Sequence, residues 1–186
     1  RSYTVFSVEQ CEGLDLPPLV EEEASDVNEC NELAKQILAL PNLKHGGNKA
    51  CYLPGPDMVL LPHQSSFEHG DFYFSTGYHE TIHWTGHPNR LNRVFGTRYG
   101  DLGYAFEELV AEIGAAFLGA HTGIPFENMR HPEYISHWLQ ILQGDSKAIF
   151  TADAKAQQAA DFVLDKTGIV GVQEVVSATN VLPVAA

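Results

Sequence analysis

The alternation of apolar and polar positions predicts strands in the first third of the chain. Residues 3–8 alternate and are rich in β-favouring side chains, so we expect a strand there. Two further apolar stretches, 49–53 and 58–61, flank the turn sequence Pro-Gly-Pro-Asp and are expected to pair as a hairpin. Residues 9–24 are acidic and contain two prolines, which favours a loop.

Apolar residues that recur at intervals of three and four predict helices over most of the remaining chain. The expected helices cover 25–40, a stretch from 69–72 to 84–86, 104–121, 132–143, and a last stretch capped by Asp145, with a loop over 87–103. Strands first and helices afterwards indicate an α+β fold, which we expect to occupy residues 1–167. Residues 168–186 are small or β-branched and are expected to form a tail, either a strand or a frayed end.

The chain is strongly acidic, which limits the classes of partner that it can bind. Among 186 residues, 24 are Asp or Glu and 11 are Lys or Arg, for a formal net charge of −13. Such a chain is expected to repel nucleic acid. No apolar run approaches the roughly 18 residues of a membrane span, and no signal peptide is recognisable, so we expect no membrane partner. The three cysteines lack metal-type spacing, which favours reduced thiols and a cytoplasmic location.

The residues most informative about chemistry are His79, Glu80 and His83, which form the motif H-E-x-x-H. On a helix, a spacing of four places both imidazoles on one face, where they can bind one ion. Zinc accepts neutral imidazole nitrogens in tetrahedral geometry. Glu80 lies about 100° further around the helix, so it can activate zinc-bound water without binding the metal. The motif therefore predicts one Zn²⁺ per chain, with Glu80 as the catalytic residue.

A hydrolytic zinc site needs a third protein ligand. The third histidine of the metzincin motif would fall at Asn89, so we expect a glutamate on a second helix instead. In the helix over 104–121, Glu108 and Glu112 share one face beside the apolar stripe, whereas Glu107 points toward water. We assign Glu108 as the third ligand and Glu112 as the acceptor for the outer N–H of a ligand histidine. The helical wheel leaves the swapped assignment open.

Other polar side chains near the motif have less specific roles. Arg90 and Arg93 are expected to pair with the helix carboxylates rather than to hold a substrate C-terminus. Tyr104 is expected to pack beside Glu108, with oxyanion stabilisation as the alternative. Three histidines are further candidates that the sequence does not rank, namely His121, His131 and His137.

Two stretches, HETIHWTGHPNRLNR and YAFEELVAEIGAAFLGA, resemble the C-terminal metallopeptidase domain of ArdC-type antirestriction proteins of conjugative plasmids. YTVFSVEQCEGL and WLQILQGDSKAIFTADAKAQQAADFVL resemble it too, so the resemblance covers most of residues 3–164. It implies a zincin-like, gluzincin-type fold with two histidine ligands, a catalytic glutamate and a third-ligand glutamate from EELVAE. In such proteins a separate N-terminal domain binds single-stranded DNA. We expect that domain to be absent here, and this fragment alone to bind no nucleic acid.

Two functions of different class are compatible with these features. The first is a zinc-dependent metallopeptidase that hydrolyses peptide bonds of an unidentified peptide or protein substrate. The alternative is a non-catalytic antirestriction or protein-binding module, whose zinc site is structural or vestigial and whose acidic segment 9–32 is a docking surface. Glu80 favours the enzyme, because a purely structural zinc has no need of it.

Overall fold

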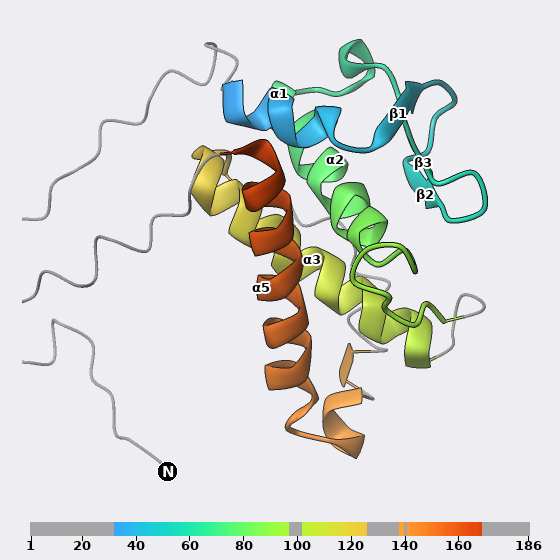
Figure 1. Ribbon diagram of the computed structural model, residues 1–186, viewed down its shortest axis with the longest axis vertical. Coiled ribbons are helices and arrows are strands. Elements are labelled where there is room, and N and C mark those ends of the chain that lie inside the picture. Colours follow the sequence, from blue (N-terminus) through green and yellow to red (C-terminus); the bar gives the residue numbers. More distant parts are fainter. Residues whose placement is uncertain (1–31, 97–101, 126–137, 140, 169–186) are drawn as a thin grey trace, which may run out of the picture.

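The computed structural model describes residues 32–96, 102–125, 138, 139 and 141–168 (Figure 1). In these ranges a small sheet is followed by long helices, in agreement with the α+β prediction. The elements, in chain order, are α1 (Glu32–Ala39), β1 (Asn42–His45), β2 (Cys51–Leu53), β3 (Met58–Leu61), the 3-10 turn η2 (Gln64–Ser66), α2 (Gly70–Thr85), α3 (Leu102–Thr122) and α5 (Ala148–Thr167).

The predicted hairpin is confirmed by the pairing of β2 and β3. The two strands are antiparallel, with Cys51 opposite Leu60. Asp57 ends the connecting turn with a φ of 50°, a left-handed conformation that Asp tolerates better than most residues. Its amide donates to the carbonyl of Pro54 at 3.3 Å, which closes the turn.

The strand β1 is one that the sequence pattern did not predict. It pairs in parallel with β3, Leu43 lying opposite Val59, so the sheet has the order β1-β3-β2. Most of its side chains are exposed, and it therefore lacks the apolar alternation that identifies a half-buried strand. Backbone hydrogen bonding to β3 defines β1, and that partner is supplied by the tertiary fold.

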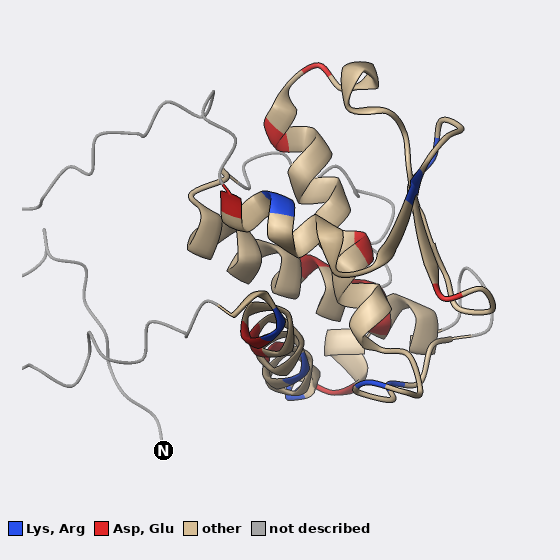
Figure 2. Cartoon of the chain, turned by 45° about the horizontal axis from the view of Figure 1, so that its top comes forward, with Lys and Arg blue, Asp and Glu red and all other residues tan. Residues whose placement is uncertain are grey.

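The helix of the histidine motif and the helix of the candidate third ligand are confirmed as α2 and α3. These two helices pack against each other, and α5 packs against α3 (Figure 1). Gly114 of α3 permits the close approach to α2, because a Cβ at this position would lie only 2.9 Å from the side chain of Ile82. The crossing brings acidic positions of α2 and α3 together in the middle of the molecule (Figure 2).

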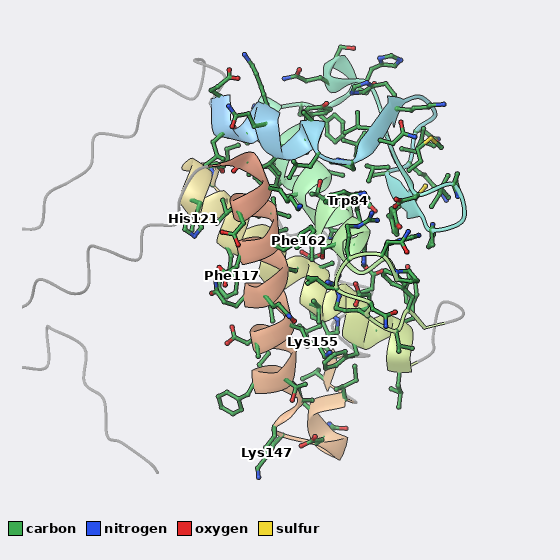
Figure 3. The ribbon with its side chains drawn as sticks, in the orientation of Figure 1. Trp84, Phe117, His121, Lys147, Lys155 and Phe162 are labelled. Atoms are coloured by element: carbon green, nitrogen blue, oxygen red, sulfur yellow. The ribbon has the colours of Figure 1, made fainter. Side chains whose placement is uncertain are left out.

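The helix predicted near the C-terminal end of the described chain is α5, and most of the apolar stripe that predicted it is buried. Its fully buried members are small, which lets α5 pack closely against its neighbours. They are Ala152, Ala156, Ala159, Ala160 and Val163. At the end of α2, Trp84 packs on Phe162 of α5 with their ring centroids 6.2 Å apart (Figure 3). The three long helices and the sheet thus form a continuous core around α2 and α3.

Several other predictions concern chain ends and helix ends. The strand over 3–8, the loop over 9–24, residues 25–31 of the first helix and residues 169–186 of the tail lie outside the described residues. Of the helix expected over 132–143, residues 138, 139 and 141–143 are described, and they are helical. The prediction that Asp145 caps the last helix is wrong, because Lys147 occupies the N-cap position of α5. Asp145 instead accepts a hydrogen bond from the Lys147 amide at 2.9 Å, in the turn before the helix.

A membrane-spanning segment was not expected, and the described helices contain none that is both long and apolar enough to cross a bilayer.

Candidate metal centre

The two histidines of the motif lie one turn apart on the buried side of α2. Their Nε2 atoms are 3.1 Å apart and their rings are nearly perpendicular, at 81°. His79 is 7% exposed and His83 8% exposed. The helical spacing of four residues therefore brings both imidazoles to one point, as the motif predicts.

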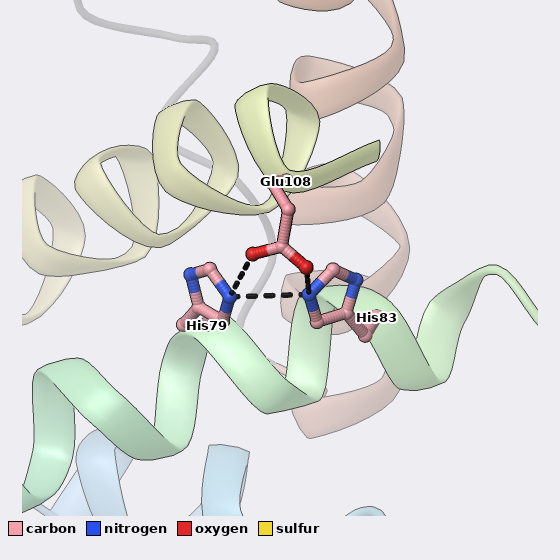
Figure 4. Close-up of side chains that lie close together, drawn as sticks. All are labelled: His79, His83 and Glu108. Atoms are coloured by element: carbon pink, nitrogen blue, oxygen red, sulfur yellow. Dashed lines mark hydrogen bonds and ion pairs between the residues drawn. The ribbon is translucent and has the colours of Figure 1, made fainter. Parts of the chain in front are cut away.

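Glu108 of α3 completes this cluster from the opposite side (Figure 4). One carboxylate oxygen lies 3.3 Å from His79 Nε2 and the other lies 3.5 Å from His83 Nε2. One ligand atom from each of the three residues lies within 4.8 Å of the others, and among the described residues no further group of three or more His, Cys, Asp or Glu is so placed.

The outer nitrogens of both histidines also face carboxylates. His79 Nδ1 lies 3.4 Å from Glu112 Oε1, and His83 Nδ1 lies 3.3 Å from Glu107 Oε1. The contact of His83 is a hydrogen bond, and that of His79 is an ion-pair contact. A carboxylate can only accept a hydrogen bond, so both contacts favour a proton on Nδ1, and a neutral ring then carries its lone pair on Nε2. Two lone pairs and a carboxylate consequently point at one place, a donor set that suits a cation.

The distances within this cluster match those of a tetrahedral metal site. Two ligand atoms bound to zinc at 2.0–2.1 Å in tetrahedral geometry are about 3.3 Å apart. The three nearest separations between His79, His83 and Glu108 are 3.1, 3.3 and 3.5 Å. The 3.3 and 3.5 Å separations are to different oxygens of Glu108, and one ligand atom from each of the three residues lies within 4.8 Å of the others. The cluster therefore has close to the spacing that one small metal ion requires.

Buried negative charge at this place also favours a cation. Four carboxylates are less than 9% exposed and carry four negative charges, namely Glu80, Glu107, Glu108 and Glu112. Arg93 is the only Lys or Arg side chain of the described residues that is equally buried, so three charges are uncompensated when both histidines are neutral. A divalent ion would remove most of this excess.

The pKa values of the clustered histidines and of Glu108 reflect the same concentration of buried charge. Burial alone would lower the pKa of each imidazole, but the carboxylates outweigh it. Glu107 and Glu108 raise the pKa of His83 to about 9, and Glu108 and Glu112 raise that of His79 well above its ordinary value. For Glu108, burial raises the pKa, yet the two histidines lower it overall. The cluster thus attracts positive charge strongly.

Glu80 lies beside the cluster rather than in it. It is 7% exposed and projects from α2 one residue after His79. Burial and the charge of Glu80 together raise the pKa of the Cys51 thiol on β2. Glu80 is not among the residues whose ligand atoms converge, and its catalytic role stays a prediction.

The position predicted for Glu107 is wrong. Glu107 is 4% exposed rather than solvated, and it contacts His83 and Arg93. The helical wheel assumed a single buried stripe, whereas α3 is buried on most of its circumference. Arg93, which lies 14 residues earlier in the chain, compensates the charge of Glu107, and no helical periodicity reveals such a partner.

The two arginines after the motif have different partners. Arg93 pairs with a carboxylate of α3, as predicted, since its Nη2 lies 2.7 Å from Glu107 Oε1. Arg90 instead pairs with Asp57 in the hairpin turn, its Nη1 donating at 2.9 Å, and its guanidinium lies 4.1 Å from the ring centre of Trp84. The prediction of a helix carboxylate as the partner of Arg90 is therefore wrong.

The remaining candidates are not brought into the cluster. Tyr104 is half-buried on the first turn of α3, one turn before Glu108. His121 is exposed and lies 13 residues after Glu108, about 20 Å along the helix axis (Figure 3). His131 and His137 lie outside the described residues.

A small sheet followed by packed helices, one of which carries H-E-x-x-H, defines a zincin-like protein. The sequence profile of the family MPTase-PolyVal, a zincin-like metallopeptidase, matches residues 29–155, and the chain belongs to this family. Similar solved structures are the antirestriction protein ArdC of plasmid R388 in an Mn(II)-bound and a metal-free form. Their sequence identities are 33% and 31%, with TM-scores of 0.67 and 0.68. These alignments cover 74% and 91% of this chain, and 53% and 61% of the ArdC chain.

A relative of a different name is DNA primase TraC of Escherichia coli, which is 42% identical over 164 residues. The alignment covers 87% of this chain but only 15% of TraC. The chain therefore spans a small part of TraC and just over half of ArdC, both of which contain a region similar to it.

Proposed function

We propose that His79, His83 and Glu108 bind one zinc ion and that the chain is a metallopeptidase domain of gluzincin type. The observation that carries the proposal is the convergence of three ligand atoms from two helices, with a carboxylate behind each histidine. The Mn(II)-bound form of ArdC supports a divalent metal in proteins of this kind. We name zinc because two imidazoles and one carboxylate are a ligand set that zinc hydrolases use.

In this proposal a zinc ion, when bound, polarises the substrate carbonyl and lowers the pKa of the attacking water. Glu80 takes the proton from that water and passes it to the leaving amine. Glu80 is buried, and its charge contributes to the raised pKa of His79, which supports a place for the carboxylate near the cluster. Glu112 and Glu107 hold the two imidazoles in the tautomer that leaves Nε2 free to bind the metal.

A second candidate is the non-catalytic module with a structural metal. One observation favours it, because His79, Glu80, His83 and Glu108 are all at most 8% exposed in the part of the chain that is described. A closed site of this kind suits a metal that stabilises the fold. The presence of a buried Glu80 outside the group of three candidate ligands supports the enzyme.

The biological setting that we propose comes from the relatives. ArdC is named as an antirestriction protein and TraC as a DNA primase. We propose that this domain acts on a peptide or protein in an antirestriction setting, and that it does not itself bind DNA. The excess of 24 acidic over 11 basic residues supports a protein partner.

The test compares zinc content and peptide hydrolysis of the wild type and Glu80→Gln. We expect about one zinc per chain in both proteins and hydrolysis of an unstructured protein substrate only by the wild type, because Glu80 transfers protons and does not bind the metal. His79→Ala/His83→Ala is the control and should contain no zinc. Zinc in the wild type without any hydrolysis would favour the non-catalytic module, whereas zinc in the double histidine variant would contradict the site itself.

A further inference from the structure

Behind His83 lies a carboxylate that the sequence pattern assigned to solvent. Glu107 Oε1 is 3.3 Å from His83 Nδ1, and Glu107 is 4% exposed. A carboxylate at this depth stays ionised only if positive charge or hydrogen-bond donors compensate it. The identity of those donors therefore decides whether Glu107 can hold the imidazole.

The donors come mainly from Arg93, which is 8% exposed. Its Nε donates to Glu107 Oε2 at 3.0 Å and its Nη2 to Glu107 Oε1 at 2.7 Å, a bidentate arrangement. The same guanidinium also donates two hydrogen bonds to α2. Nη2 donates to the Ile82 carbonyl and Nη1 to Thr85 Oγ1, both at 2.7 Å.

These contacts fix Glu107 relative to the helix that carries His83. Ile82 and Thr85 flank His83 in α2, so Arg93 connects the last turn of α2 to the first half of α3. A guanidinium does not lose its proton in proteins, and its planar fork sets the direction of the carboxylate.

We propose that Glu107 and Arg93 are positioning residues for His83. Glu107 holds the Nδ1–H tautomer and the ring orientation by direct contact, and Arg93 acts through Glu107. The inference rests on the zinc site proposed above. It assigns a role to two residues beyond the H-E-x-x-H motif and the third ligand, and it gives each histidine its own carboxylate, Glu107 for His83 and Glu112 for His79.

The first test is the zinc affinity of Glu107→Gln, measured by competition with a chromogenic chelator. We expect an affinity about 10- to 100-fold below that of the wild type, the usual effect of losing the outer partner of a ligand histidine. The absorption spectrum of the Co(II)-loaded variant should also change, because the ligand orientation changes. Asp57→Asn is the matched control, since it disrupts an Arg–carboxylate pair that does not contact either histidine, and it should bind zinc as the wild type does.

A second test separates positioning from a structural role. Arg93→Met alone leaves a buried carboxylate without its partner and is expected to unfold easily. Arg93→Met/Glu107→Leu removes both charges, and replacement of both partners by apolar groups can be nearly neutral for stability. We expect this double variant to be more stable than Arg93→Met in urea unfolding measured without a chelator. Its zinc affinity should stay about as low as that of Glu107→Gln.

The outcomes are distinct. Wild-type affinity in either Glu107→Gln or the double variant would overturn the positioning role while leaving the proposed site intact. Absence of zinc binding by the wild type would overturn both proposals. Recovery of stability together with recovery of affinity in the double variant would show that the pair stabilises the fold and nothing more.

Discussion

Glu108 and Glu112 lie one turn apart on α3 but face different nitrogens. Glu108 contacts the Nε2 atoms of both histidines, whereas Glu112 contacts the outer nitrogen of His79. A third ligand atom can bind the same ion as the two histidines only if it faces the place toward which both Nε2 lone pairs point. The geometry therefore supports the assignment of Glu108 as third ligand over the swapped assignment.

This difference predicts the effect of removing each carboxylate. Glu108→Ala should nearly abolish tight zinc binding because two ligands remain, and Glu112→Ala should weaken it by about 10- to 100-fold. Chelator competition measures both affinities, and Asp153→Ala, an exposed site on α5, is the control that should change nothing. A larger loss for Glu112→Ala than for Glu108→Ala would invert the two roles.

The crossing of α2 and α3 depends on the absence of a side chain at position 114. A Cβ there would meet three atoms of Ile82 at 2.9 to 3.1 Å, and Ile82 is fully buried. Space at this contact therefore sets the distance between the histidines of α2 and the carboxylates of α3.

Gly114→Ala is accordingly expected to lower the free energy of unfolding. Overpacking in a core costs about 1–3 kcal/mol, which exceeds the gain of up to about 1 kcal/mol that alanine brings to a helix. Zinc affinity should fall as well, since the ligands on the two helices move apart. Urea unfolding with and without zinc measures both effects. Gly144→Ala, where no atom lies within 4 Å of the new Cβ, should not destabilise, and an equal effect at both positions would contradict the packing argument.

The hairpin is attached to the end of α2 by Arg90 and Asp57. The hydrogen bond from Arg90 is the main reason that the pKa of Asp57 lies below its ordinary value. The ion pair therefore contributes stability that is complete above the pKa of an unfolded-state Asp, about 4. That contribution disappears as the pH falls through the lower pKa of the folded state.

Asp57→Asn should remove this contribution while keeping a residue that tolerates the positive φ. At pH 7 we expect the variant to be less stable by about 1 kcal/mol, a modest value because the carboxylate is partly exposed. Urea unfolding at pH 7 and near pH 3 measures the difference, which should shrink at the lower pH. A difference that is equal at both pH values would mean that the charge of Asp57 is not its cause.

Considered as a whole, the molecule carries a net charge of −13. Affinity for single-stranded DNA depends largely on Lys and Arg that displace counterions from phosphates, and the 11 basic residues are outnumbered by 24 acidic ones. We expect fluorescence anisotropy with a labelled oligonucleotide to show no binding below about 100 µM protein at physiological salt. Micromolar binding would contradict a domain whose partners are proteins.

Features governed by short-range rules were predicted well. The hairpin, the motif helix and α3 depend on turn residues, apolar periodicity and helix ends, which are all local. β1 was missed because its exposed side chains carry no pattern, and the solvated position of Glu107 was wrong because α3 has neighbours on more than one side. In both cases a distant segment decides the environment.

The sequence by itself determined that His79 and His83 share a helix face with Glu80 beside them, since a spacing of one and four residues has a fixed geometry on any helix. It also narrowed the candidates for a third ligand to the glutamates of α3. Only the tertiary structure decided which histidine nitrogen each of Glu107, Glu108 and Glu112 faces. The same holds for the pairing of Arg93 with Glu107. The physical reason is that these contacts join segments through the crossing of two helices, and the angle and depth of that crossing follow from packing at Gly114 and across the core rather than from local spacing.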